Sequence, residues 1–422
     1  MKTIAILLFL ATYALLLALP KIRAWIALGS AAVFVVLGIL PVGKVFGAID
    51  WNVILMIAGS MGVVSLFIDS RMPELLADKL IERMPDVRWA IISLALFAGI
   101  ISAFIDNVAT VLMVAPIALT VAKKLRISPV PAIIAIAVSS NLQGAATLVG
   151  DTTSILLGGY AKLNFLDFFV YRGKPGMFWV VQAGALMAMF ILLWLFRGNR
   201  QPLTPVSEAE VEDLFPTILL VGMVLLLILA SFIPGKIAIT NGLICVGLFL
   251  VGILRGFVKS GDHGPAVKAL RDIDYFTILL LAGLFVVIGG ITEAGVVNDI
   301  AQLFARIGNG NLFVIYTIVV WASVFFSAFI DNIPYVATML PVMSGIAAIM
   351  GIDPTILYFG LLSGATLGGN LTPIGASANI AALGILRKEG HAVGTGTFMR
   401  IGVPFTMAAV LTGYAMIWFL WR

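Results

Sequence analysis

One six-residue sequence, Ser-Ala-Phe-Ile-Asp-Asn, occurs twice in this chain, at 102–107 and at 327–332, and both copies lie within apolar surroundings. The copies are 225 positions apart (327 − 102 = 225), and upstream of them an offset of 224 aligns Ile49-Asp50 with Ile273-Asp274. Further pairs at these offsets are Pro116 and Pro341, Pro129 and Pro354, Gly144 and Gly369, Thr147 and Thr372, Gly150 and Gly375, Ile155 and Ile380, Gly59 and Gly283, and Asp69 and Glu293. The fold must therefore contain the same unit twice.

The repeated unit is a membrane unit. Hydrophobic residues make up 61% of the 422 residues and charged residues only 11%, which is too few to cover a water-soluble protein. Apolar runs close to the ~20 residues that cross a bilayer recur from residues 4–19 to residues 402–420. The net charge of +5 lies in short loops, so it does not indicate a nucleic-acid surface, and the single Cys245 excludes a disulfide within the chain.

Apolar periodicity predicts five full spans and one helical hairpin in each half. The spans lie near residues 4–19, 24–41, 51–68, 130–157 and 177–196, and near 214–232, 237–254, 276–291, 355–386 and 402–420. The hairpins, at 89–125 and 311–350, are long apolar stretches with Asp-Asn in the middle, which is typical of a pair that enters and leaves on one side. An odd number of spans inverts the second copy. We therefore expect an all-α polytopic membrane protein with two inverted repeats, residues 1–196 and 214–422, joined by a linker at 197–213.

Charge sets the expected orientation. With the N-terminus outside, eighteen of the 26 Lys and Arg residues fall in cytoplasmic loops and eight outside. This distribution predicts periplasmic termini, a cytoplasmic linker and a multi-pass protein of the cell inner membrane. No small-x-small cleavage site precedes Lys21, so the first apolar run is interpreted as a transmembrane helix, and 71–88 as an interfacial helix.

Two aspartates are the first functional candidates. An ionisable side chain at mid-membrane costs about 2.5–3.5 kcal/mol on insertion scales, so Asp106 and Asp331 need a reason to be there. Each would lie at a hairpin tip. Capping of the second hairpin helix is the structural explanation, ion coupling is the functional one, and the two are compatible.

Residues 139–154 and 363–379 form the second constellation, because glycines, hydroxyls and amides interrupt otherwise apolar spans. Such helices unwind, and the freed backbone groups and side chains become ligands. Close helix packing would explain the glycines but not the polar side chains. The candidate substrate-binding residues are Asn107, Asn141, Thr147, Asp151, Thr152, Ser154, Asn332, Asn370, Thr372, Ser377 and Asn379, and the candidate coupling residues are Asp106, Asp151 and Asp331.

These motifs carry a resemblance. Phe-Ile-Asp-Asn, Gly-x-Ala-Thr-Leu-Val-Gly-Asp at 144–151 and Gly-Gly-Asn-Leu-Thr-Pro-Ile-Gly-Ala-Ser-Ala-Asn at 368–379 resemble the arsenite permease (ArsB)-like branch of the ion transporter superfamily. That superfamily also includes NhaD-type sodium/proton antiporters, citrate carriers and the P protein. The resemblance implies a scaffold domain and a transport domain built from the hairpins and broken helices. The chain departs from it at 150–155, where relatives often read Gly-Asp-Pro-Pro-Asn-Ile.

The charged residues of the candidate site limit which substrates it can bind. Up to three carboxylates share one site, and neither motif contains Lys or Arg, so a bare di- or tricarboxylate would be repelled unless cations accompanied it. The leading interpretation is a secondary transporter, not an enzyme, that exports arsenite or antimonite in exchange for protons and uses no cofactor. A sodium/proton antiporter, a sodium-coupled citrate or dicarboxylate carrier and a passive channel stay open, as does an associated ATPase subunit. An intramembrane aspartyl protease is disfavoured, because Leu148 replaces the first glycine of Gly-x-Gly-Asp.

The repeat is least symmetric at the second constellation. Asp151 aligns with Ala376, and Ser154 aligns with Asn379. We therefore expect the two identical tips to be shared architecture and the asymmetric broken helices to determine substrate identity.

Overall fold

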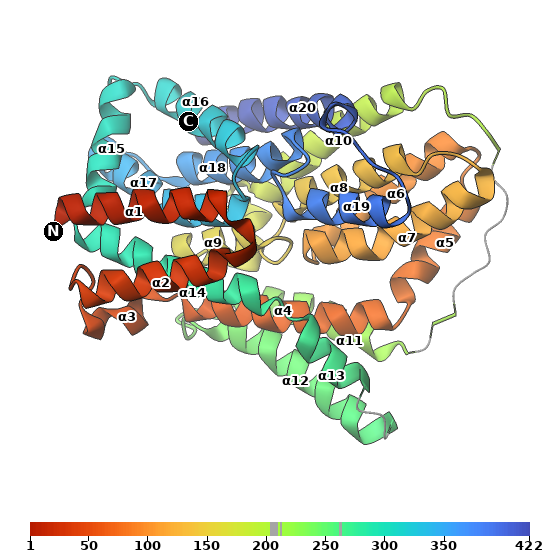
Figure 1. The fold of residues 1–422 in the computed structure, drawn as a ribbon, viewed down its shortest axis with the longest axis horizontal. Coiled ribbons are helices and arrows are strands. Elements are labelled where there is room, and N and C mark those ends of the chain that lie inside the picture. The colour runs from red at the N-terminus through yellow and green to blue at the C-terminus, as the bar shows by residue number, and fades with distance from the viewer. Residues whose placement is uncertain (203–209, 212, 261–263) are drawn as a thin grey trace.

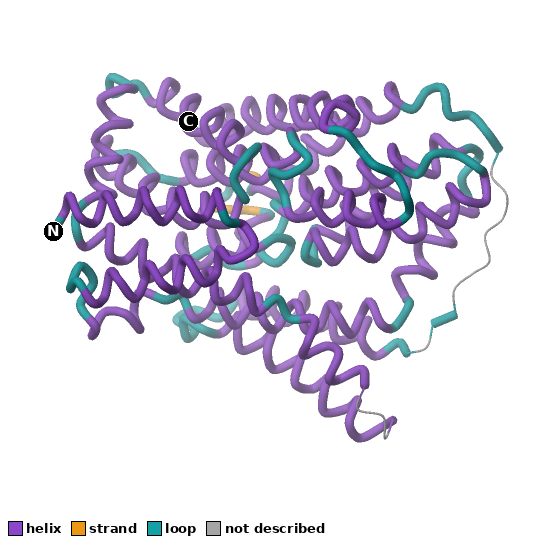
Figure 2. The backbone as a smooth tube through the Cα atoms, viewed as in Figure 1, coloured by secondary structure: helices purple, strands orange, loops and turns teal. Residues whose placement is uncertain are grey.

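The computed structural model describes residues 1–202, 210–211, 213–260 and 264–422, and these are almost entirely helical (Figures 1 and 2). The only sheet in these ranges is a short hairpin of β1 (Val170–Tyr171) and β2 (Lys174–Pro175). The predicted linker at 197–213 includes residues 203–209 and 212, which lie outside the described residues.

The helices follow the predicted spans closely. The first half contains α1 (Lys2–Ala18), η1 (Pro20–Ile22), α2 (Arg23–Val36), α3 (Val42–Ala48), α4 (Trp51–Asp69), α5 (Met72–Glu82), α6 (Val87–Ser102), α7 (Asn107–Leu125), α8 (Val130–Gly144), α9 (Thr152–Ala161), η2 (Phe165–Phe168) and α10 (Met177–Leu195). The second half contains α11 (Phe215–Ser231), α12 (Thr240–Ser260), α13 (Gly264–Asp272), α14 (Tyr275–Glu293), α15 (Val296–Ile307), α16 (Leu312–Ser327), α17 (Asn332–Met350), α18 (Thr355–Gly368), η3 (Gly369–Leu371), α19 (Ser377–Lys388) and α20 (Thr395–Trp421).

The repeat reappears in the helix ends. Both ends of α4 and α14 differ by 224 (275 − 51 and 293 − 69), and both ends of α7 and α17 differ by 225 (332 − 107 and 350 − 125). The second copy is inverted, because Trp51 at the start of α4 and Glu293 at the end of α14 line the same cavity. The predicted inverted repeat is confirmed.

Two groups of helices make up the molecule. In one group α4 packs along α12 and α2 packs along α14, and in the other α6 packs on α8, α16 on α18 and α10 on α20. Figure 1 shows the first group along the lower part of the molecule and the second along the upper part. These groups correspond to the scaffold and the transport domain that the resemblance implied, and the polar chain breaks lie in the second group.

Both hairpins and both broken helices are present. The connection between α6 and α7 spans residues 103–106, and that between α16 and α17 spans residues 328–331. The predicted span 130–157 is divided between α8 and α9, and the predicted span 355–386 is divided among α18, η3 and α19. The backbone therefore leaves regular helix at the positions where glycines, hydroxyls and amides gather in the sequence.

Two short helices, α3 and α13, were not predicted. Each carries a lysine that pairs with the other repeat: Lys44 with Glu293 at 2.8 Å, and Lys268 with Asp69. These ion pairs are repeat-related (268 − 44 = 224 and 293 − 69 = 224), and they lie at opposite ends of the molecule. Each pair therefore joins the two halves at one mouth of the scaffold.

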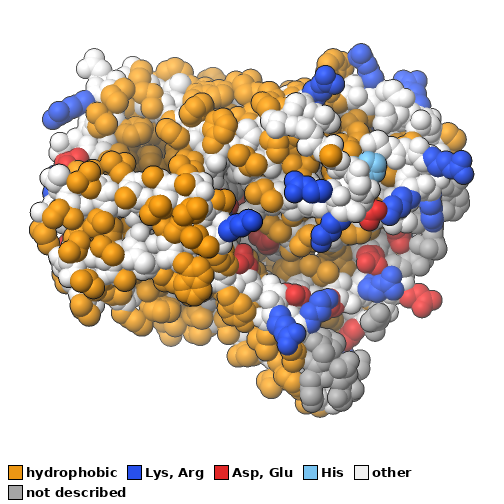
Figure 3. Space-filling model, viewed as in Figure 1, with side chains coloured by type: hydrophobic (Ala, Val, Ile, Leu, Met, Phe, Trp, Pro, Cys, Tyr) orange, Lys and Arg blue, Asp and Glu red, His pale blue; other side chains and the backbone are white. Residues whose placement is uncertain are grey.

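The surface has one basic end. Figure 3 shows hydrophobic side chains over most of the visible face and most of the Lys and Arg side chains at the right of the view. The N-terminus lies at the opposite end, and the C-terminus lies in the half of the view nearer to it (Figure 1). The basic side chains are therefore concentrated at the end opposite the N-terminus.

Two repeat-related glycines set the closest helix crossings of the scaffold. A Cβ atom at Gly59 would lie 2.4 Å from the backbone of Cys245 on α12, and one at Gly283 would lie 2.6 Å from the backbone of Ala27 on α2. Only glycine allows these backbones to approach so closely. Cys245 is thus a buried packing residue.

This packing predicts opposite effects of the same substitution at different glycines. Gly59→Ala and Gly283→Ala should each destabilise the protein by about 1–3 kcal/mol, because the added methyl group overpacks a helix crossing. Gly29→Ala and Gly247→Ala, where a Cβ meets nothing within 4 Å, should be neutral or stabilising by up to about 1 kcal/mol. Thermal unfolding of the purified variants in detergent measures the difference, and equal effects in the two sets would contradict it.

Candidate substrate and ion site

The three candidate carboxylates all begin helices. Asp106 accepts hydrogen bonds of 3.0 and 3.1 Å from two amides in the first turn of α7, and Asp331 accepts one of 3.1 Å at the start of α17. Asp151 accepts one of 2.8 Å from the first amide of α9. These bonds satisfy amides that the helix itself leaves free. Capping is therefore real at all three positions, and it leaves further oxygen lone pairs for other partners.

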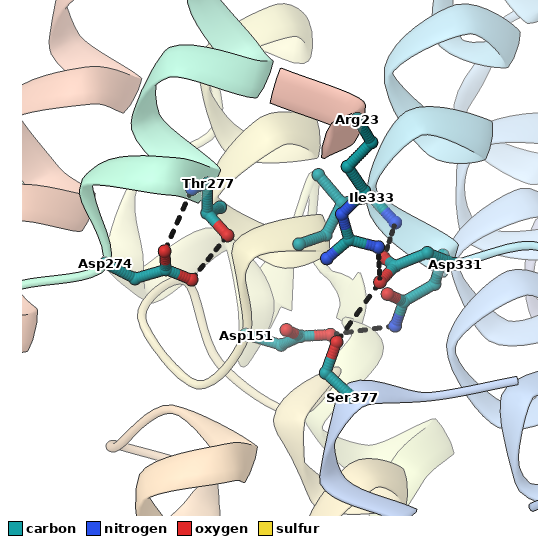
Figure 4. A network of polar contacts seen from close by, with 8 residues as sticks. Arg23, Asp151, Asp274, Thr277, Asp331, Ile333 and Ser377 are labelled. Carbon is teal, nitrogen blue, oxygen red and sulfur yellow. Dashed lines mark hydrogen bonds and ion pairs between the residues drawn. The ribbon is translucent and has the colours of Figure 1, made fainter. Parts of the chain in front are cut away.

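Asp331 has a cationic partner that the sequence analysis missed. Arg23, the first residue of α2, donates from Nη1 to Asp331 Oδ2 at 2.7 Å (Figure 4). The side chains are 19% and 13% exposed, so the pair is largely shielded from water. Ser377 Oγ donates to the same oxygen at 3.1 Å. In the sequence, Arg23 is one of the eighteen basic residues whose distribution predicts the orientation.

Asp151 receives bonds from both halves of the chain. Thr153 Oγ1 donates to its Oδ2 at 2.8 Å, and Asn332 Nδ2 from the second hairpin approaches the same oxygen at 3.4 Å. The side chain is almost fully buried. Among the described residues, the ion pairs include Asp331 but neither Asp106 nor Asp151. These two carboxylates are the ones without a resident cation.

A cavity of about 360 Å³ leads to these groups. Five of the candidate residues line it: Asp106, Asn107, Asp151, Asn332 and Ser377. Its wall also includes three further carboxylates and one lysine: Asp69, Asp272, Asp274 and Lys268. All three of those carboxylates are engaged. Asp69 pairs with Lys268, Asp272 accepts from Ser65 at 2.6 Å, and Asp274 accepts from the backbone amide and the hydroxyl of Thr277 at 3.0 and 2.6 Å (Figure 4). The cavity wall is therefore strongly acidic.

A second cavity opens from the other end. It is larger, about 1240 Å³, and its wall contains Asp50, Glu293 and Lys44, which are the repeat equivalents of Asp274, Asp69 and Lys268. This larger cavity is not the candidate substrate site, because neither hairpin-tip aspartate nor Asp151 lines it. The two cavities are repeat-related vestibules, and only the smaller one reaches the carboxylates. The structure therefore represents a state open from the end that carries Asp69 and Lys268.

Other candidate residues form a buried chain of amides. Asn107 donates to Asn141 at 2.9 Å, Asn141 donates to Asn370 at 3.1 Å, and Asn370 donates to the carbonyl of Val138 at 2.9 Å. Asn141 and Asn370 are fully buried. This chain joins α8 of the first repeat to η3 of the second. It places Asn141 and Asn370 behind the cavity wall, with Asn107 as the link to the wall.

The remaining candidates support the broken helices. Ser154 donates to the carbonyl of Gly144 at 3.1 Å, and its repeat equivalent Asn379 donates to the carbonyl of Gly369 at 3.0 Å. Thr147 and its equivalent Thr372 each donate to a carbonyl of the neighbouring hairpin tip. Ser154 and Asn379 thus perform the same task although their identities differ. Thr152 lines a small void of about 10 Å³ beside Asp106 and Asp151.

No group of three or more His, Cys, Asp or Glu side chains in the described ranges is arranged to hold a metal ion. The site instead offers carboxylate, side-chain amide and hydroxyl groups. Such groups exchange protons or bind hydroxylated solutes by hydrogen bonds.

The profile of the citrate transporter (CitMHS) family matches residues 13–364. The chain belongs to the citrate transporter family. An uncharacterized transporter of Mycobacterium tuberculosis is 33% identical over 433 residues, covering 99% of this chain and 98% of that protein. The human P protein is 26% identical over 451 residues, covering 86% of this chain and 53% of the P protein.

Solved structures agree with the fold. The Alcanivorax borkumensis YdaH transporter has a TM-score of 0.60 at 16% identity, over 89% of this chain and 86% of that one. Neisseria gonorrhoeae MtrF, from a class of antimetabolite efflux pumps, has a TM-score of 0.56 at 16% identity, over 89% and 82%. The citrate transporter family member described here is a multi-pass membrane transporter and not an enzyme.

The amide chain generates a prediction. Asn141→Ala should destabilise the protein by about 1–3 kcal/mol, because it leaves Asn107 and Asn370 with unpaired polar atoms in a buried region. Thr120→Ala serves as a control, since that exposed hydroxyl bonds only to the carbonyl of Pro116 in its own helix. Thermal unfolding in detergent measures both variants. If Asn141→Ala lowers the stability no more than Thr120→Ala does, the chain of amides does not stabilise the protein.

Proposed function

We propose that this transporter exports arsenite or antimonite from the cell in exchange for protons, across the inner membrane. The observation that carries the proposal is the charge of the cavity wall, where five carboxylates accompany a single lysine. A bare polycarboxylate entering this cavity would meet like charges in a medium of low dielectric constant. A neutral solute with several hydroxyl groups would not.

The polar side chains of the cavity wall support the same choice of substrate. Arsenous acid carries three hydroxyl groups, and Asp106, Asp151 and Asn332 supply oxygens that accept hydrogen bonds from them. Because Asp106 and Asp151 have no resident cation, each can also hold a proton. Solute and protons would then compete for the same carboxylates, and this competition is the basis of exchange.

In the proposed orientation the basic end of the molecule is cytoplasmic, so the cavity that reaches the carboxylates faces the cytoplasm. Solute would bind from that side, and movement of the helix group containing the hairpins against the scaffold would expose it to the other vestibule. The two halves, residues 1–196 and 214–422, would exchange roles in this step, as expected for inverted repeats.

Citrate transport is the second candidate, because the chain belongs to a family described as citrate transporters. Arg23 supplies a guanidinium near the site that could bind a carboxylate, as guanidinium groups do. In the structure this group is already bound to Asp331. Citrate would have to displace Asp331 or arrive with its own cations.

Transport by purified protein in vesicles tests the proposal. In vesicles acidified inside and carrying the cytoplasmic face outward, arsenite should accumulate, and Asp106→Asn or Asp151→Asn should slow it by more than about tenfold, or about 1.4 kcal/mol. Asp299→Asn is the matched control, because that carboxylate is exposed and pairs with Lys2 outside the cavity.

The outcomes separate the candidates. Citrate flux without arsenite flux would replace the first proposal with the second. Sodium/proton exchange without either solute would identify an antiporter, and downhill flux that ignores the gradient would identify a channel. Unchanged coupling in the Asp106, Asp151 and Asp331 variants would remove the carboxylate mechanism.

A further inference from the structure

The Arg23–Asp331 ion pair crosses the boundary between the two groups of helices. Arg23 begins α2, which packs along α14 in the scaffold, whereas Asp331 lies at the tip of the second hairpin. The guanidinium also lies 5.9 Å from the ring centre of Phe276 on α14, so the scaffold holds it from two sides. Any movement of the hairpins against the scaffold must act on this pair.

The equivalent position in the other half carries no charge. Gly283 approaches Ala27 and its repeat mate Gly59 approaches Cys245, so the packing relates α2 to α12 by an offset of 218 (245 − 27). With the same offset, Asn241 is the repeat equivalent of Arg23 (23 + 218 = 241). Asn241 accepts a hydrogen bond from Lys236 at 3.3 Å and lines the larger cavity, away from Asp106. One tip aspartate therefore has a built-in counter-ion, and the other does not.

The surroundings of the second tip differ from those of the first. Asp331 is closed off by Arg23 and Ser377, and the larger vestibule does not reach it. Asp106 faces the open cavity together with Asp151, while the other charged groups of that cavity wall are Asp69, Asp272, Asp274 and Lys268. The identical hexapeptides thus occupy electrostatically different sites.

We propose that Arg23 is a positioning residue that acts as the resident counter-ion of Asp331. It holds the second hairpin tip against the scaffold in the state open to the smaller cavity. Asp106 and Asp151, rather than Asp331, then bind and release the exchanged protons. The positioning role of Arg23 rests on geometry alone, and the assignment of proton exchange to Asp106 and Asp151 rests on the proposed function. When the transporter opens to the other side, the Arg23–Asp331 pair separates.

Cysteine accessibility tests the positioning role without any substrate. In a Cys245→Ser background, Leu112→Cys reports on the smaller cavity and its repeat equivalent Ala337→Cys reports on the larger one. Arg23→Gln should lower labelling of the first reporter by a membrane-impermeant maleimide by about tenfold, or about 1.4 kcal/mol, and should raise labelling of the second. Arg23→Lys should restore part of the difference, because a cation returns. Lys21→Gln removes a neighbouring exposed charge and should change neither reporter.

A double variant protects the test against misfolding. Arg23→Gln alone leaves Asp331 unpaired, whereas Arg23→Gln with Asp331→Asn removes both charges and should fold as well as the parent. Labelling of the double variant should shift in the same direction as that of Arg23→Gln. Unchanged labelling of both reporters in the folded double variant would overturn the positioning role.

The assignment of proton exchange has a separate readout. The double variant should still exchange arsenite for protons with the parent stoichiometry, although more slowly, while Asp106→Asn should not. Loss of proton coupling in the double variant, with downhill arsenite flux retained, would overturn this assignment. If the unmodified protein carries no arsenite while labelling shifts as expected, the proposed function fails and the positioning role of Arg23 stands.

Discussion

The structure depends on how backbone carbonyls freed inside the membrane find donors. Each broken helix loses several internal hydrogen bonds, and an unpaired group in an apolar medium costs several kcal/mol. Thr147 and Thr372 each donate to a carbonyl of a hairpin tip, and Ser154 and Asn379 donate across the helix breaks. These bonds fasten each tip to its own broken helix. The aspartates can lie at mid-membrane because this frame already satisfies the backbone around them.

The scaffold depends on a different constraint, which is the close approach of helix backbones to one another. Gly59 and Gly283 bring α4 and α14 against the backbones of α12 and α2, and ion pairs of Lys44 and Lys268 join the repeats at the two mouths. All of these contacts come in repeat-related pairs. Symmetric packing allows the same scaffold to border a vestibule at either end. In this structure only one of the two vestibules reaches Asp106 and Asp151.

Much of this could be predicted from the sequence, because it is encoded locally or by the repeat. The ends of α4, α7 and their equivalents follow the offsets of 224 and 225, and Asp106 and Asp331 cap helices where the motif predicted tips. Arg23 could not be assigned, since its partner is 308 positions away and a basic residue between two apolar runs has the pattern of a topology signal. Similarly, the sequence could not tell that Asn141 and Asn370 contact each other behind the cavity wall, since no offset of the repeat relates them (370 − 141 = 229).

The two halves differ at the expected Asp151 and Ala376, and also at a position that the sequence comparison did not single out. Ser154 and Asn379 looked like a difference in substrate contacts, yet both brace a helix break through a backbone carbonyl. Two differences change the electrostatics. Asp151 faces the cavity where the other half has Ala376, a difference already visible in the sequence, and Arg23 pairs with Asp331 where the other half has Asn241. Asp151 adds a carboxylate without a cationic partner beside Asp106, whereas Arg23 pairs with the carboxylate of Asp331. Both differences concentrate unpaired negative charge near the first hairpin tip. In the proposed mechanism, the two hairpin tips therefore have different roles: Asp106 and Asp151 exchange protons, and the Arg23–Asp331 ion pair holds the transporter in one state. A symmetric scaffold can then move while a single site binds the solute.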